Sequence, residues 1–392
     1  MAPPRITQLE LVVFEHTVQD LGVDSGGFNP VYVKGSVSKA RLGILKVYTD
    51  AGIVGVNPGD SCRMIGGGAV AQLRYVAPYL IGKNALERER IYSDLKRALR
   101  QSDRTAVGAV DVALWDIAGK YHNAPVYQLL GGYRKTIPAY ASTYHADENG
   151  GLASPEAFAD FAEQCREMGY PAFKIHGWGG GPIERETATI RAVRRRVGDQ
   201  MDLMLDPACV YDTWALALKL GRACDEANYF WLEDPYKDGG LSIFAHRKLR
   251  ESIRTPLLIG EHVFGLEQHA DFMVHGGTDF IRGGAMEDGG ITGVMKIAHA
   301  AEGLGLDVEL HVGGLAHRHC LAAIRNTNYY ELGLVHPSIK RTKPPIYPLE
   351  FNDELDSIDA NGHVPVPQGP GLGVEIDWDY VRKNQIETVV LG

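Results

Sequence analysis

The sequence predicts an α/β fold made of a (β/α) barrel and a smaller α+β domain. A chain of 392 residues is too long for one ordinary domain and suits such a pair. From about residue 136, short apolar runs alternate with amphipathic stretches of helical spacing, as expected of a parallel sheet with crossover helices. Eight runs of this kind predict that the sheet closes into a barrel.

The first part of the chain is predicted to be mainly antiparallel sheet. Residues 5–17 are typical of a strand, and residues 39–56 of a hairpin turning at Asp50-Ala51-Gly52. The Gly-, Asp- and Pro-rich segments 20–36 and 57–68 are predicted to be two long loops, which often serve as lids or binding segments. Helices are expected at 85–100 and 106–121.

The barrel strands are predicted from eight sequence runs, which are IPAYAST, PAFKIHGW, MDLMLDPA, YFWLEDP, PLLIGEH, DFIRGG, LDVELHVGG and YYELGL. The stretches between several of them have helical spacing, as for Phe158, Phe161 and Cys165. The tail is richer in Pro, Gly and Asp and is expected to leave the barrel and pack against the first domain. We therefore expect domains at 1–130 and 131–355 and a returning segment at 356–392.

The composition limits the class of function. Apolar residues make up 45% and charged residues 23%, as in ordinary globular proteins, and a net charge of −9 offers no basic surface for nucleic acid. The five cysteines are scattered without a Cys-x-x-Cys pair, which favours a reducing compartment, and we expect a cytoplasmic protein. We see no signal peptide and no run of about 18 apolar residues, so no membrane partner is expected.

Ionisable residues appear at the C-terminal ends of the apolar runs. They are Lys174, His176, Asp206, Glu233, Glu261, His311 and Glu331. Because the C-terminal strand ends of such a barrel meet at one face, these side chains are expected to lie together. Three of them, at spacings of 27 and 28 residues, are carboxylates from successive strands that would repel one another. A hard cation such as Mg²⁺ removes that repulsion.

Each of these residues also has an ordinary structural interpretation. An Asp-Pro or Glu-Asp-Pro at a strand end is more often a turn or helix cap than a metal ligand, and a Lys-x-His in a strand is usually a surface feature. His311 taken alone is compatible with a hydrogen-bonded core histidine, and Glu331 with a helix cap. What favours a metal site with catalytic residues around it is one acid at each of three consecutive strand ends, bracketed by a lysine and a pair of histidines.

At this point the sequence resembles the enolase superfamily, and within it the mandelate racemase group. The resemblance rests on GAVDVALWDIAGKYHNAPVYQLLGG (108–132), FKIHGW, LMLDPA, FWLEDPY, IGEH and EDGGITG, and it covers nearly the whole chain. It implies a modified, (β/α)7β-like barrel under an N-terminal α+β capping domain that the C-terminal tail completes. It also implies a homo-oligomer acting on a small-molecule carboxylate.

The resemblance also assigns roles to the strand-end residues. It implies Mg²⁺ as cofactor, with Asp206, Glu233 and Glu261 as its ligands. Lys174-Ile175-His176 stands where the group typically carries Lys-x-Lys, His311 matches the histidine base of the seventh strand, and Glu331 matches an acid that hydrogen-bonds the substrate carboxylate. Enzymes of this superfamily pair a Lys or His base with Mg²⁺, which stabilises the charge that develops on that carboxylate.

One position departs from the group. The seventh-strand histidine usually has an aspartate partner after the sixth strand, where this chain has Gly284. Without that partner His311 is expected to be a general acid rather than a strong base, and His176 becomes the better base. Glu287 or Asp288 are alternative partners that the sequence does not place. Arg282 shares the strand parity of Gly284, so it points either to the site or to the surface.

The expected reaction is dehydration of an acid sugar to a 2-keto-3-deoxy acid, because two histidines supply a base and an acid for a leaving hydroxide. Racemisation or epimerisation beside the carboxylate is the alternative, and a catalytically silent ligand-binding barrel is a further one, which Gly284 favours. The expected substrate-binding residues are Asn29, Tyr32, Lys34, Tyr144 and Arg282, with Asp24 and His145 nearby.

Overall fold

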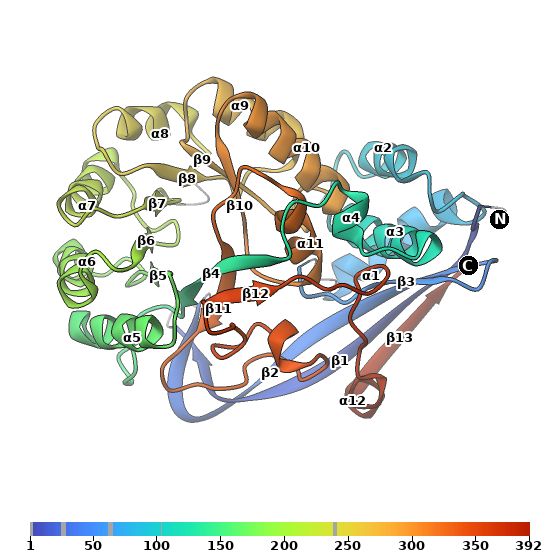
Figure 1. Ribbon diagram of the computed structural model, residues 1–392, viewed down its shortest axis with the longest axis horizontal. Helices are drawn as coiled ribbons and strands as arrows, with labels where there is room; N and C mark the ends of the chain where they lie inside the picture. The colour runs from blue at the N-terminus through green and yellow to red at the C-terminus, as the bar shows by residue number, and fades with distance from the viewer. Residues whose placement is uncertain (1–2, 25–28, 62–65, 103, 238–240) are drawn as a thin grey trace.

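The computed structural model describes residues 3–24, 29–61, 66–102, 104–237 and 241–392 (Figure 1). The central parts of the two loops predicted over 20–36 and 57–68 therefore lie outside the described residues. Within the described parts of the chain, no helix combines the length and the apolar character that a membrane span requires.

The N-terminal domain is built on an antiparallel sheet with the strand order β13-β1-β2-β3. The first three of these strands along the chain are β1 (Ile6–Val23), β2 (Pro30–Thr49) and β3 (Val54–Asn57). The predicted strand and hairpin are present, but much of the predicted loop over 20–36 is strand, since Val23 pairs with Pro30. Asp20 adopts a positive φ of 56° at a break in register, and this irregularity lets the ribbon continue towards the barrel.

Four helices pack against one face of this sheet or follow it towards the barrel. They are α1 (Gly66–Leu80), α2 (Arg88–Ala98), α3 (Thr105–His122) and α4 (Val126–Leu129). Most of α3 is buried, which agrees with its apolar sequence. Gly55 allows the close approach of β3 to this helix, because a Cβ there would overlap the carbonyl oxygen of Ala113. Asn123, with φ 52°, ends α3 in the left-handed conformation common at helix ends.

The second domain is a curled parallel sheet in the order β10-β9-β8-β7-β6-β5-β4-β11. Its strands are β4 (Thr136–Thr143), β5 (Ala172–His176), β6 (Asp202–Asp206), β7 (Trp231–Glu233), β8 (Leu257–Ile259), β9 (Phe280–Gly283), β10 (Asp307–Leu310) and β11 (Tyr330–Val335). The intervening helices are α5 (Pro155–Glu167), α6 (Ile183–Val197), α7 (Trp214–Glu226), α8 (Ile243–Arg250), α9 (Gly265–Val274), α10 (Gly290–Gly303) and α11 (Leu315–Ala323). Figure 1 shows several of them around the outside of the sheet. The predicted (β/α)7β arrangement is therefore confirmed.

The interior of the barrel is arranged in two layers. The lower layer is aromatic and apolar and consists of Tyr140, Ala172, Met204, Trp231, Leu258, Phe280 and Tyr329. Because side chains alternate along a strand, the residue two positions later on each strand points to the same interior. These later residues are Ser142, Lys174, Asp206, Glu233, Gly260, Arg282 and Glu331. An apolar floor thus supports a second layer in which five of these seven residues are ionisable.

The tail was predicted to pack against the first domain, and in the structure it pairs with strands of both domains. After a short 3-10 helix η1 (Leu349–Phe351), β12 (His363–Pro365) pairs antiparallel with β4. Helix α12 (Trp378–Asn384) then covers part of the outer face of the N-terminal sheet, and β13 (Gln385–Leu391) pairs with β1. The N-terminal domain completed by β13 is called the capping domain below.

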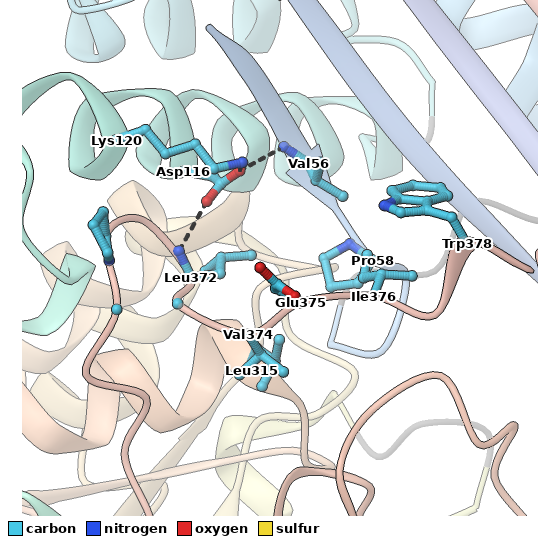
Figure 2. Close-up of a pocket in the computed structure, with 13 residues that line it drawn as sticks. Val56, Pro58, Asp116, Lys120, Leu315, Leu372, Val374, Glu375, Ile376 and Trp378 are labelled. Carbon is cyan, nitrogen blue, oxygen red and sulfur yellow. Dashed lines mark hydrogen bonds and ion pairs between the residues drawn. The ribbon is translucent and has the colours of Figure 1, made fainter.

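Asp116 on α3 joins the tail to the capping domain (Figure 2). Its Oδ2 accepts from the backbone N–H of Val56 and its Oδ1 from that of Leu372, both at 2.8 Å. Lys120 pairs with the same carboxylate. Next to this junction is an open hollow of about 710 Å³, bounded by β3, α3 and the tail. None of the predicted site residues lines this hollow. At the junction, Asp116 and Lys120 form an ion pair with each other.

Candidate metal centre and catalytic residues

The structure brings the predicted metal ligands together at the C-terminal mouth of the barrel. Asp206 and Glu233 end β6 and β7, whereas Glu261 lies two residues beyond the end of β8. One carboxylate oxygen from each lies within 4.8 Å of the others. Asp206 is further held by the backbone N–H of Ala208, which donates to Oδ1 at 2.8 Å.

The charges around these carboxylates are strongly coupled. Burial alone would raise the pKa of Asp206, but the charges of Lys174 and His176 hold it well below its usual range. Burial raises the pKa of Glu233 to about 7. The positive charges of Arg282 and Lys174 act to lower this pKa, and the neighbouring carboxylates act to raise it. Burial is thus the main reason that Glu233 resists ionisation, whereas Asp206 is held ionised by its basic neighbours.

Two buried cations lie among the acidic side chains. Lys174 Nζ is 2.9 Å from Glu233 Oε2, 2.9 Å from Glu331 Oε1 and 3.3 Å from Asp206 Oδ2. Arg282 Nη2 is 2.9 Å from Glu233 Oε1 and 2.6 Å from Glu331 Oε2. Although burial alone would lower the pKa of Lys174, these carboxylates raise it well above its usual value. Both cations are thus permanently charged and fixed in place.

His176 has one ring nitrogen committed to the scaffold. Its Nδ1 is 2.7 Å from the carbonyl oxygen of Thr143, which can only accept, so Nδ1 carries a proton. The other nitrogen, Nε2, lies 3.1 Å from Asp206 Oδ2 and faces the carboxylate cluster. In this contact Nε2 donates its proton to the Asp206 carboxylate, and it can act as a general base once that proton has been lost.

His311 contacts the cluster at a different carboxylate, that of Glu261. Its Nε2 is 3.5 Å from Glu261 Oε2, and its backbone N–H donates to the carbonyl oxygen of Gly283. Burial lowers the pKa of His311, against the opposing effect of Glu261 and Glu331. The two histidines thus contact different members of the predicted metal site.

The structure also places the two alternative partners of His311. Asp288 accepts from the backbone N–H groups of Gly284 and Gly265, both at 2.8 Å. Its carboxylate therefore holds the backbone of the loop after β9. Glu287 is placed differently. A Cβ at Gly284 would lie 2.5 Å from Glu287 Oε2 and 4.0 Å from the Cβ of His311. The Glu287 carboxylate therefore occupies the space that a side chain at residue 284 would use.

The predicted substrate-binding residues differ in what they contact: some pack against the barrel and others lie at the surface. The Tyr32 ring on β2 stacks on His336 with centroids 5.2 Å apart, and Tyr144 contacts the same ring edge-on. Asn29 donates its side-chain N–H to Asp24 at 3.2 Å, and Lys34 is solvent-exposed on β2. Tyr32 thus docks the capping hairpin on the barrel.

Arg282 does point into the barrel, which decides between the two orientations that the sequence left open. It is fully buried, and both of its terminal nitrogens donate to the Tyr140 hydroxyl at 3.1 Å. Its guanidinium is therefore engaged with protein groups beneath the carboxylates.

Several residues of the site were not predicted. Ser142 donates to Glu331 Oε1 at 2.8 Å, and its position one step beyond the apolar floor was the available signal. His145, which the sequence predicted to lie near the substrate, has its ring 4.8 Å from that of His176, and burial together with this neighbour lowers the pKa of His145 to about 3. His262 Nε2 contacts Glu261 Oε1 at 2.9 Å, where only its place beside Glu261 in the sequence gave a hint.

The donor set fits a magnesium ion. Magnesium prefers oxygen ligands from one or two carboxylates and usually keeps some of its waters. Here three carboxylates from neighbouring strand ends converge, and burial and mutual repulsion raise the pKa of one of them to about 7. A divalent cation would offset that excess negative charge, so the residues present are suited to hold it.

Comparisons with known proteins agree with this architecture. Residues 28–131 match the mandelate racemase / muconate lactonizing enzyme N-terminal domain, and residues 157–380 match the enolase C-terminal domain-like family. A D-xylonate dehydratase of Haloferax volcanii is 28% identical over 88% of this chain and 85% of its own length.

Solved structures are similar over nearly the full chain. A D-glucarate dehydratase from Agrobacterium tumefaciens, complexed with magnesium, has a TM-score of 0.84 and 30% identity and covers 98% of this chain and 99% of its own. An N-succinyl Arg/Lys racemase from Bacillus cereus has a TM-score of 0.81 and 25% identity and covers 99% of this chain and 100% of its own. With both domains matched, the chain belongs to the mandelate racemase / muconate lactonizing enzyme family of the enolase superfamily.

Proposed function

We propose that this protein removes the proton next to a substrate carboxylate with the help of Mg²⁺ and thereby dehydrates an acid sugar. The observation that carries the proposal is the convergence of Asp206, Glu233 and Glu261, flanked by His176 on one of them and His311 on another. The similarity to acid-sugar dehydratases, which include the D-xylonate and D-glucarate enzymes, supports the choice of substrate class.

Each residue has a role that follows from its contacts. A magnesium ion bound by the three carboxylates would stabilise the negative charge that develops on the substrate carboxylate. His176 Nε2 takes the proton from C2, because the Thr143 carbonyl keeps the other nitrogen protonated. Lys174 adds a fixed positive charge beside the substrate carboxylate, and Glu331 holds Lys174 and Arg282 in place.

The second half of the reaction needs an acid. When the C3–O bond breaks, the hydroxyl leaves as water after taking a proton from His311. The resulting enol becomes the 2-keto-3-deoxy acid by taking a proton at C3 and releasing the proton of its C2 hydroxyl to solvent. The lowered pKa of His311 makes its protonated form a ready proton donor. Glu287, whose carboxylate lies where a side chain at residue 284 would be, is the residue we propose as the partner of His311 in place of the usual aspartate.

The test is proton NMR of the protein with Mg²⁺ in D₂O and a panel of aldonic and aldaric acids. We expect a 2-keto-3-deoxy product from at least one acid. The variant His176→Asn is expected to lose both C2 deuterium exchange and product, by about 10²–10⁴-fold. His311→Asn is expected to keep C2 exchange and lose product, while the exposed His299→Asn serves as a control and behaves as wild type.

Racemisation or epimerisation is the second candidate, because both histidines present Nε2 to the carboxylate cluster and a racemase is among the similar structures. Deuterium at C2 without loss of water, dependent on both histidines, would establish it and overturn dehydration. A panel in which no acid exchanges its C2 proton would refute both reactions and favour a barrel that only binds ligand.

A further inference from the structure

A second cluster of metal-binding side chains adjoins the three carboxylates. Cys209 lies three residues after Asp206, and His262 directly follows Glu261. The Cys209 Sγ, a ring nitrogen of His262 and a carboxylate oxygen of Glu261 lie within 4.8 Å of one another. Thiolate, imidazole and carboxylate together are the ligand types of zinc, whereas magnesium takes oxygen ligands. The two clusters share Glu261 but differ in the cation they suit.

Asp234 adjoins this cluster through its backbone. Its carbonyl oxygen accepts from the Cys209 N–H at 3.1 Å. Its side chain is only 1% exposed, and its Oδ2 has no hydrogen-bond partner among the described residues. Buried carboxylates are normally paired or bound to metal.

An ion pair between His262 and Glu261 accounts for only part of this arrangement. The two side chains are 2.9 Å apart, and the contact raises the pKa of His262. That pair does not explain why a thiol is within 4.8 Å of both groups. A cation bound among the three side chains explains these contacts.

We propose that Cys209, His262 and Glu261 form a second cation site that takes a thiophilic divalent ion such as Zn²⁺. On binding, the S–H bond of Cys209 breaks, a sulfur–metal bond forms and the proton passes to solvent. Because Glu261 belongs to both clusters, the ion at this site and a magnesium ion would lie next to each other with Glu261 between them, as in two-metal sites.

The test uses Co²⁺ as the probe, because a thiolate ligand gives cobalt a charge-transfer absorption that oxygen and nitrogen ligands do not give. The purified protein in excess Mg²⁺ is titrated with Co²⁺. We expect the wild type to develop this absorption and to saturate at one equivalent. Cys209→Ala and Cys209→Ser should lose it, and Cys320→Ala, which alters a buried cysteine of the core, should keep it.

Asp206→Asn separates this site from the predicted magnesium site. Asp206 is a member of the carboxylate cluster only, so this variant should lose Mg²⁺ affinity and keep the thiolate–cobalt absorption. Thermal unfolding of each variant verifies that it is folded before titration. Absence of the absorption in the folded wild type, or its persistence in folded Cys209→Ala, would overturn the second site, whatever the outcome of the NMR assay for dehydration.

Discussion

Replacing Arg282 by methionine tests whether the buried cations hold the carboxylate layer together. Arg282 is fully buried, and its Nη2 lies 2.9 Å from Glu233 and 2.6 Å from Glu331. Removing one partner from a buried ion pair leaves uncompensated charge and typically costs roughly 3–5 kcal/mol. Methionine fills part of the volume, so we expect the free energy of unfolding of Arg282→Met to fall by about that amount.

The assay is urea unfolding followed by tryptophan fluorescence, with and without Mg²⁺. Arg325→Met is the matched control, since Arg325 is exposed and pairs with Glu302, and such pairs contribute at most about 1 kcal/mol. Mg²⁺ should restore more stability to Arg282→Met than to the wild type, because the ion then offsets charge that Arg282 no longer neutralises. If Arg282→Met and the control are destabilised equally, the buried cation does not compensate the carboxylates and the reasoning is refuted.

Three further outcomes follow from single residues. Burial raises the pKa of Glu186 to about 7 from 4.5 in the unfolded chain. Because the folded protein holds this proton more tightly, the free energy of unfolding is highest at low pH and falls as the pH rises from about 4.5 to 7. Glu186→Gln should therefore gain up to about 3 kcal/mol over wild type between pH 4.5 and 8 in urea unfolding, and an unchanged difference would contradict this. A Cβ in Gly293→Ala would overlap the carbonyl of Asp288 and should cost about 1–3 kcal/mol by thermal unfolding, whereas Gly303→Ala, with open space around it, should not destabilise. Tyr32→Ala removes the ring that docks the hairpin and should raise KM about 2–13-fold, the equivalent of 0.5–1.5 kcal/mol, while a Tyr32→Phe variant with equally weakened binding would argue against stacking.

The sequence predicted the barrel and the meeting of its strand ends because both follow from local periodicity. Asp206, Glu233 and Lys174 each end an apolar run, and side-chain alternation places them on one interior face. Glu261 was found by the same reasoning although it lies beyond its strand, since the parallel strands end near one another. These inferences needed only the order of residues along each strand.

Other features depend on partners far away in the chain. The segment 20–36 has the composition of a loop, but pairing between β1 and β2 keeps most of its described residues in strands. The orientation of Arg282 depended on the carboxylates of two other strands, and the space beside His311 that Glu287 fills depends on how the loop after β9 turns. Composition and periodicity carry no information on such contacts.

The pairing of β13 with β1 has a consequence for how the molecule is made. The two strands stand side by side in one sheet, although nearly the whole sequence separates them. A chain synthesised from its N-terminus at roughly 5–20 residues per second therefore exposes one edge of β1 until β13 emerges. During that time the barrel can already fold, while the edge of β1 stays unpaired. The sheet of the capping domain is thus completed after the barrel strands have been made, and the exposed edge of β1 is a place where aggregation during synthesis would begin.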